Sequence, residues 1–227
     1  MQLVDRIETR RFVGREFLLW LWFESELFEG TLTTREHGSF GFFIEKQIVL
    51  SFAKEATRIK GEQPAAGREA KESVRRGKLP ESASFRMILH DRETSFTLKA
   101  EQLAVAGLKL ATVLGGAEEE QPEQLVKGPR PPPRRARESR ADEARRESDE
   151  EHEAFYERMQ MTREFEGVLE ALYGDFLSLR LGRGWAVVLE AMTAWAAGEE
   201  VDAERYRRER ARSLGARSRG MKEPGAA

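Results

Sequence analysis

The sequence predicts an α+β protein, in which an antiparallel sheet packs on an apolar N-terminal helix and is followed by a long helix and a helical hairpin. Three observations support this prediction. The densest apolar run of the chain is Phe17 to Phe23. Short strand-like segments separated by turn residues follow it, and apolar residues at spacings of three and four come later in the chain.

The apolar run is flanked by arginine and glutamate residues and is too short to cross a bilayer, which requires about 20 apolar residues. A helix that is apolar on nearly all sides has to be buried on nearly all sides. We therefore expect the central core helix here, and the alternative is an exposed helix that binds a partner. Residues 1–11 are mixed in character, and we expect a strand or a lead-in turn there.

Gly30 separates this helix from a series of short segments rich in alternating, β-branched and aromatic residues. Such segments indicate an antiparallel meander with one apolar face. Strands are predicted at 31–34, 40–44, 48–52 and 55–60, with turns at 37–39 and 45–47.

Residues 65–77 carry charged helix formers and few apolar residues, which predicts an exposed amphipathic helix. A hairpin should follow, with strands at 84–90 and 94–100 and a turn at residues 91–93. A last strand at 107–114 is expected to complete the sheet.

The middle of the chain is nearly free of apolar residues. It begins with Glu118, Glu119 and Glu120, passes through prolines and then becomes rich in arginine. Because such a segment has little to bury, it cannot offset its own ordering entropy, and we expect a disordered linker. From about Glu138 the pattern also permits a helix that continues into the next segment.

The second organised block has a heptad-like seam of apolar residues, formed by Phe155, Phe165, Leu169, Leu172, Phe176 and Leu179. Residues 182–184 interrupt it, and an apolar helix is predicted at 185–197, which favours a tight antiparallel helix pair. The predicted units are an α+β core domain at 1–116, a linker at 117–147, a helical hairpin at 148–198, and a charged helix with a frayed tail at 199–227.

The sequence contains no recognisable catalytic motif. It has no cysteine, and its three histidines, His37, His90 and His152, stand far apart. Gly38 to Gly41 is more typical of a hairpin turn than of a phosphate site. Asp91 is better explained as a turn cap than as a partner that orients His90. We therefore expect no enzyme activity, no metal, no cofactor and no small-molecule substrate. No secretion or lipidation signal is visible, so we expect a cytoplasmic protein without a membrane anchor.

The formal net charge is -2, so the field of the whole protein does not favour nucleic acid. The basic residues are nevertheless grouped, and basic arms that neutralise phosphates give salt-sensitive, sequence-independent binding. The alternative is a solubilising linker and tail of mixed charge. The candidate DNA-binding residues are Arg75, Arg76, Lys78, Arg130, Arg134, Arg135, Arg137, Arg140, Arg145, Arg146, Arg205, Arg207, Arg208, Arg210 and Arg212.

The order of landmarks resembles the C-terminal half of the bacterial recombination-associated protein RdgC family. The matching segments are the apolar helix at 17–21, a Gly-x-Phe-like strand at 38–44, the Gly77-Lys78 pair, the paired strands at 85–89 and 95–98, and Leu108-Lys109-Leu110. The likeness covers about residues 12–114 and, more loosely, 155–181. The family's N-terminal half has no counterpart in this sequence, and the family has no Pro/Arg-rich linker.

The resemblance implies a duplex-DNA-binding protein that is not an enzyme. Members of the family form a ring-shaped dimer around DNA and restrain recombinase action, so a homodimer and an association with the nucleoid are implied here. From the residues and the resemblance together we expect non-specific DNA binding linked to recombination or nucleoid maintenance. The alternative is an assembly module that forms oligomers through its C-terminal helices.

Overall fold

The computed structural model describes the backbone of residues 3–52, 55–62, 64–65, 67–111 and 135–220, and the side chains of these residues except 3–12, 135–151 and 216–220. The chain divides into two compact units. One combines Met1–Lys109 with Gly167–Ala227, and the other is Leu110–Glu166.

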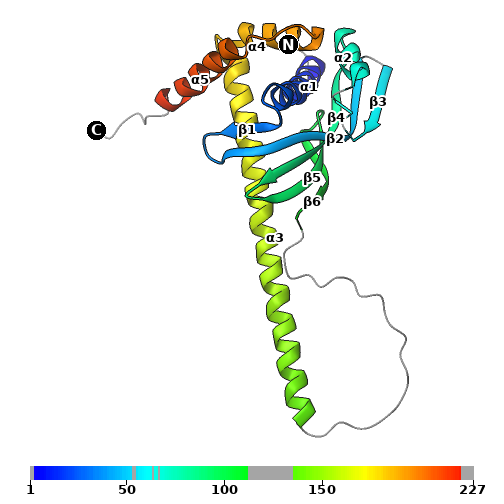
Figure 1. The fold of residues 1–227 in the computed structure, drawn as a ribbon, viewed down its shortest axis with the longest axis vertical. Helices are drawn as coiled ribbons and strands as arrows, with labels where there is room; N and C mark the ends of the chain where they lie inside the picture. Colours follow the sequence, from blue (N-terminus) through cyan, green and yellow to red (C-terminus); the bar gives the residue numbers. More distant parts are fainter. Residues whose placement is uncertain (1–2, 53–54, 63, 66, 112–134, 221–227) are drawn as a thin grey trace. The chain divides into compact units, whose positions relative to one another are not determined.

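The described residues form an antiparallel sheet of six strands and five helices, which confirms the predicted α+β class (Figure 1). The helices are α1 (Leu3–Leu27), α2 (Arg68–Arg75), α3 (Arg135–Leu181), α4 (Trp185–Ala197) and α5 (Ala203–Gly220). The strands are β1 (Thr31–Thr34), β2 (Gly38–Phe52), β3 (Glu55–Gly61), β4 (Leu79–Leu89), β5 (Arg92–Lys99) and β6 (Ala104–Lys109).

The sheet has the order β1-β2-β4-β5-β6, and β3 pairs with β2 on the same edge as β1. One face of the sheet is apolar because alternate residues of its strands are buried. On this face the ring of Phe85 lies 4.9 Å from that of Phe42 and 5.5 Å from that of Phe96. Helix α1 covers β2 and β4 on this face, as Figure 1 shows.

The opposite side of α1 is covered by the C-terminal helices. Phe17 and Trp20 contact Phe176 of α3, at ring distances of 5.4 and 5.7 Å. Phe23 contacts Trp195 of α4 at 5.8 Å. Helix α1 is therefore buried between the sheet and the C-terminal helices, and the prediction of a central core helix at residues 17–23 is confirmed. Its backbone is helical from Leu3, so the strand or lead-in turn expected at residues 1–11 is wrong from Leu3 onward.

Strand β2 is one long strand where the sequence predicted two strands and a turn at 45–47. The pairing with β4 shifts between Ile44 and Ile48, and Lys46 has a φ of 64°. Such a bulge bends a strand without reversing it. The bend allows the first half of β2 to pair with β1 and the second half to pair with β3.

The hairpin of β4 and β5 is present, but its turn is one residue earlier than predicted. Leu89 pairs with Arg92, so the loop consists of His90 and Asp91 alone. Both have positive φ, 50° and 62°, as a type I′ turn requires. The aspartate is therefore part of the turn, as the sequence indicated.

Helices α3 and α4 do not form the tight antiparallel pair that was expected. Figure 1 shows α4 crossing the end of α3 instead of running back along it. The seam residues Leu172, Phe176 and Leu179 are buried, and Phe176 faces α1 of the same chain. The apolar spacing of α3 is therefore explained by its packing on α1. Because this face of α3 contacts α1, it is not available for α4 to run back along it.

Candidate functional site

The predicted basic linker lies largely outside the described side chains. Arg130 and Arg134 lie outside the described residues altogether. For Arg135, Arg137, Arg140, Arg145 and Arg146, the structure describes only the backbone, which belongs to α3. Residues 135–147 are helical. They were expected within the disordered linker at 117–147, with a helix from about Glu138 as the alternative.

The cationic cluster at the end of α2 is engaged with the protein. The Arg75 Nε atom donates to the carbonyl of Ala196 at 2.7 Å, and Nη2 donates to that of Ala197. A guanidinium at the C-terminus of α4 compensates the partial negative charge of that helix end. Lys78 donates to the Thr57 hydroxyl at 2.9 Å. Arg76 is paired with Glu72 at 3.2 Å, but its side chain is 72% exposed. Of this cluster, Arg76 is the residue that solvent reaches most freely.

Helix α5 turns its arginines in opposite directions. Arg205, Arg208 and Arg212 are exposed and follow a spacing of three and four, which places them along one side of the helix. Two of them form surface ion pairs: Arg205 with Glu190 at 3.0 Å, and Arg212 with Glu209 at 4.0 Å. These three residues form the outer arginine row of α5.

Arg210 points inward and is unsuited to the predicted phosphate contact. Its side chain is 15% exposed, its Nε donates to Glu24 at 2.8 Å, and its Nη2 donates to the carbonyl of Thr33 at 3.0 Å. Arg207 is exposed but lies over the ring of Phe28 at 5.3 Å.

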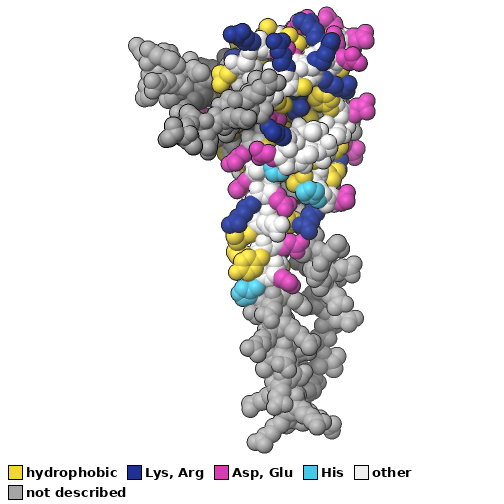
Figure 2. Space-filling model, turned by 90° about the vertical axis from the view of Figure 1, so that its left-hand side faces the viewer, with side chains coloured by type: hydrophobic (Ala, Val, Ile, Leu, Met, Phe, Trp, Pro, Cys, Tyr) yellow, Lys and Arg dark blue, Asp and Glu magenta, His cyan; other side chains and the backbone are white. Residues whose placement is uncertain are grey.

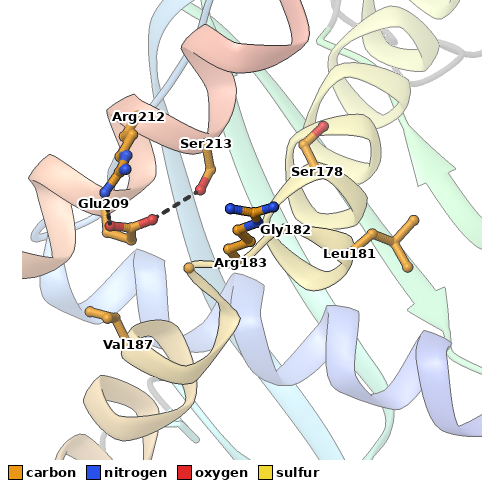
Figure 3. Close-up of a pocket in the computed structure, with 9 residues that line it drawn as sticks. Ser178, Leu181, Gly182, Arg183, Val187, Glu209, Arg212 and Ser213 are labelled. Atoms are coloured by element: carbon orange, nitrogen blue, oxygen red, sulfur yellow. Dashed lines mark hydrogen bonds and ion pairs between the residues drawn. The ribbon is translucent and has the colours of Figure 1, made fainter.

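A pocket of about 620 Å³ lies where the turn between α3 and α4 faces α5 (Figure 3). Glu209, Arg212 and Ser213 project into it from α5, and Arg183 reaches it from the turn, as Figure 3 shows. A Cβ atom at Gly184, which precedes the first turn of α4, would lie 2.2 Å from a Glu209 carboxylate oxygen. The carboxylate thus lies where the partial positive charge of that helix end is strongest. The pocket therefore lies between Arg183 and Arg212, a member of the outer arginine row. Glu209 already occupies the N-terminal end of α4 beside this pocket.

Charges of both signs are interspersed over the surface that Figure 2 shows. Lys and Arg side chains (dark blue) lie beside Asp and Glu side chains (magenta) on this face. This mixture agrees with the small net charge of -2. A polyanion would therefore be expected to contact local rows of arginine and not a broad positive face.

The most unusual polar group is the carboxyl of Glu24, which is fully buried on α1. Its Oε1 accepts hydrogen bonds from the Tyr206 hydroxyl at 2.5 Å and from Arg210. Burial raises the pKa of Glu24 above its ordinary value, while Arg210 and the Tyr206 hydrogen bond oppose that rise. Burial, together with the nearby Glu24, raises the pKa of Tyr206 well above its usual range.

A second carboxylate, Glu26, joins three helices. Its two oxygens accept hydrogen bonds from the indole N–H groups of Trp22 at 2.7 Å and Trp195 at 2.8 Å. Lys71 of α2 pairs with it at 2.6 Å and lies over the Trp195 ring. Each polar group among Glu26, Trp22, Trp195 and Lys71 has a partner. These bonds hold α1, α2 and α4 together.

Neither the burial of Glu24 nor the bonds of Glu26 was predicted from the sequence, because both residues were assigned to the polar end of the core helix. One signal was available. Glu24 lies four residues after Trp20, within the apolar part of α1, and Tyr206 is the one aromatic residue of α5. An isolated tyrosine in a charged helix indicates the side of that helix that is buried.

The structure gives no metal-binding cluster and no membrane-spanning helix within the residues it describes. No three His, Asp or Glu side chains among them come together as metal ligands would. None of the helices in that part of the chain has the length and apolar character needed to cross a bilayer. His37 and His90 lie in separate turns of the sheet, and His152 lies on α3.

No family model, curated protein or solved structure matches this chain.

Proposed function

We propose that this protein binds duplex DNA without sequence specificity, through phosphate contacts, in recombination or nucleoid maintenance. The observation that carries the proposal is the outer arginine row of α5, Arg205, Arg208 and Arg212, with Arg183 across the adjacent pocket. Arginine is well suited to phosphate because its planar guanidinium forms two parallel hydrogen bonds.

The ion pairs of this row do not prevent phosphate binding. The Arg205 and Glu190 side chains are 49% and 63% exposed. Exposed pairs contribute only about 0 to 1 kcal/mol, so a phosphate can replace the carboxylate at little cost. Arg210 and Arg75 are excluded from the proposed contact surface, because their guanidinium groups are already bound, that of Arg210 to buried Glu24 and that of Arg75 to the carbonyls at the end of α4.

The basic segment from Lys127 to Arg146 is the second part of the proposed surface. It contains eight lysines and arginines and three acids. The backbone of residues 135–146 belongs to α3. The link to recombination rests on the resemblance to the RdgC family.

The test is a titration of duplex DNA binding against salt. Binding should weaken steeply with salt, because each neutralised phosphate contributes about 0.9 to the slope of log K against log salt. Changing Arg205, Arg208 and Arg212 together to glutamine should reduce that slope by about 2 to 3. A second variant with glutamine at Lys127, Arg130 and Arg134 tests the linker in the same way.

The matched control replaces three exposed cations of the sheet, Arg58, Lys60 and Lys99, by glutamine. It removes the same charge as the α5 variant and should leave more of the slope intact. Equal losses in both variants would show that only net charge matters. Absence of binding at low salt would remove the proposal.

The competing proposal is an assembly module, and one observation favours it. Phe155 and Tyr156 of α3 are 58% and 66% exposed, and Met159 lies one turn further on the same helix. Exposed aromatic clusters of this kind are typical of protein interfaces. If they form an interface, changing Phe155 and Tyr156 to serine should lower the mass measured by sedimentation equilibrium, without DNA. An unchanged mass would exclude this surface.

A further inference from the structure

Helix α5 packs on α4 and also reaches α1 through inward side chains. Its composition is strongly charged, and Tyr206 is the one fully buried side chain in the part of the helix whose side chains are described. Tyr206 packs against Phe23 at a ring distance of 5.0 Å. Arg210, one helical turn further, also reaches into the α1 interface. The contact between α5 and α1 therefore depends in part on what these two residues meet.

Both residues meet the same oxygen. The Tyr206 hydroxyl donates to Glu24 Oε1 at 2.5 Å and accepts the indole N–H of Trp20 at 3.0 Å. Arg210 Nε donates to Glu24 Oε1 at 2.8 Å. Among the described residues, Glu24 Oε2 has no hydrogen-bond partner. We call Glu24, Tyr206 and Arg210 the α5 latch.

The two oxygens of Glu24 differ in their partners, because Oε1 accepts two hydrogen bonds and Oε2 has none within the described part of the chain. An ionised carboxylate spreads its charge over both oxygens and needs donors on both when water is excluded. A neutral acid accepts through its carbonyl oxygen and carries the proton on the other. A buried Oε2 without a partner therefore costs less as the hydroxyl of a neutral acid than as a charged oxygen, although that hydroxyl also has no acceptor among the described residues.

The groups that surround Glu24 act in both directions. From α5 it faces Arg210 and the neutral Tyr206, and from α3 it faces Asp175, whose Oδ2 lies 3.8 Å from Arg210 Nη2. On the side of β1, the Thr33 carbonyl accepts a hydrogen bond from Arg210. Arg210 favours the ionised form of Glu24, and the negative charge of Asp175 opposes it. Burial is the largest of these effects and favours the protonated form.

We propose that a proton on Glu24 controls the docking of α5 on α1, so that the docked helix holds the proton and the undocked helix releases it to solvent. Undocking would expose Glu24 to water and separate it from Tyr206 and Arg210. The latch is a property of the fold and does not depend on DNA binding.

The sign of the pH dependence follows from the raised pKa of Glu24 in the docked state. Docking is strongest below the ordinary pKa of a glutamate and weakens as the pH rises through the raised pKa of docked Glu24. Tyr206 acts in the same direction at alkaline pH, because its pKa is also raised in the docked state. Neither group stabilises docking as the pH rises.

The test is hydrogen exchange of the α5 backbone amides between about pH 5 and pH 8, corrected for the intrinsic exchange rate. Linkage to one proton makes the protection factor of α5 fall by up to about tenfold per pH unit, until the pH passes the raised pKa. Glu24→Gln keeps a carbonyl for Tyr206 and Arg210 but does not titrate, so its protection should be flat. Glu190→Gln, which alters the surface partner of Arg205, should keep the slope of the wild type.

Amides of β4 and β5 provide the internal reference, because the strand that Arg210 of the latch contacts is β1, through the Thr33 carbonyl. The same slope in the sheet and in α5 would mean global unfolding and would overturn the proposal. A flat profile in the wild type, or an unchanged slope in Glu24→Gln, would overturn it too. If Glu24→Gln does not fold, the infrared carbonyl band of a protonated carboxylic acid in the wild type decides, because it must be present at low pH and disappear over the same range.

Discussion

At the scale of single residues, the close approach of two segments of backbone explains why a glycine stands at one position of α1. Gly14 of α1 lies so near the turn after β5 that a Cβ atom there would be 2.0 Å from the carbonyl oxygen of Ala100. The obstacle is main chain, which cannot rotate out of the way as a side chain can. Glycine at this position therefore fixes the distance between α1 and the sheet.

Gly14→Ala should destabilise the protein by about 1 to 3 kcal/mol, because the gain in helix propensity is smaller than the cost of overpacking. Gly215→Ala is the control. Gly215 lies in α5, and no atom is within 4 Å of the position where its Cβ would be. It should be neutral or stabilise by up to about 1 kcal/mol. The free energy of unfolding in urea gives both values, and equal effects would contradict the packing argument.

At the scale of elements, the apolar seam of α3 belongs to the core of its own chain. Leu172 is fully buried, whereas Leu181 at the end of the same helix is 82% exposed. The sequence pattern alone is equally consistent with a coiled-coil interface between chains. The contacts of Phe176 with Phe17 and Trp20 show which partner this part of the seam has.

Leu172→Glu should therefore unfold the protein and not simply dissociate an oligomer. A buried, unpaired charge costs about 3 to 5 kcal/mol. Leu181→Glu introduces the same charge on the same helix and should change stability by less than about 0.5 kcal/mol. Thermal unfolding followed by circular dichroism measures both. A folded Leu172→Glu protein with a smaller mass would instead assign the seam to an interface between chains.

The elements that the sequence predicted correctly are those whose pattern is local. Alternation in β4 and β5 and the apolar run of α1 are read from neighbouring residues, and the structure confirms both. The long β2 strand was missed because Lys46 adopts a positive φ that its residue type does not indicate. The direction of α4 depends on α1, which lies far away in the sequence, so spacing within the helix could not reveal it.

The candidate site was predictable to a smaller extent. Counting arginines found the outer row of α5, but it also included Arg210, whose partner Glu24 lies 186 residues away. Nothing within α5 distinguishes Arg210 from Arg208 by type. The difference is the position of Arg210 four residues after the buried Tyr206, because residues four apart share a helix face.

At the scale of the whole molecule, α1 is shared by the sheet on one side and the C-terminal helices on the other. Neither layer keeps a complete core if α1 is removed. The unit formed by residues 1–109 and 167–227 should therefore unfold in one cooperative step.

Two signals in a urea titration test this expectation. Far-ultraviolet circular dichroism reports the helices and the sheet together, and near-ultraviolet circular dichroism reports Trp20, Trp22 and Trp195, which are buried around α1. The two midpoints should coincide. Separate midpoints would show that the sheet and the C-terminal helices are stable independently of each other.

The bond between Trp20 and Tyr206 has a consequence for biosynthesis, because it spans 186 residues. A ribosome adds about 5 to 20 residues per second, so the core helix α1 is made roughly 10 to 40 s before its last covering helix. Until α3 and α4 are made, its tryptophans have only the growing sheet to shield them. Each newly made molecule thus passes through a stage at which aggregation competes with folding. This stage ends when the C-terminal helix has been made and covers α1.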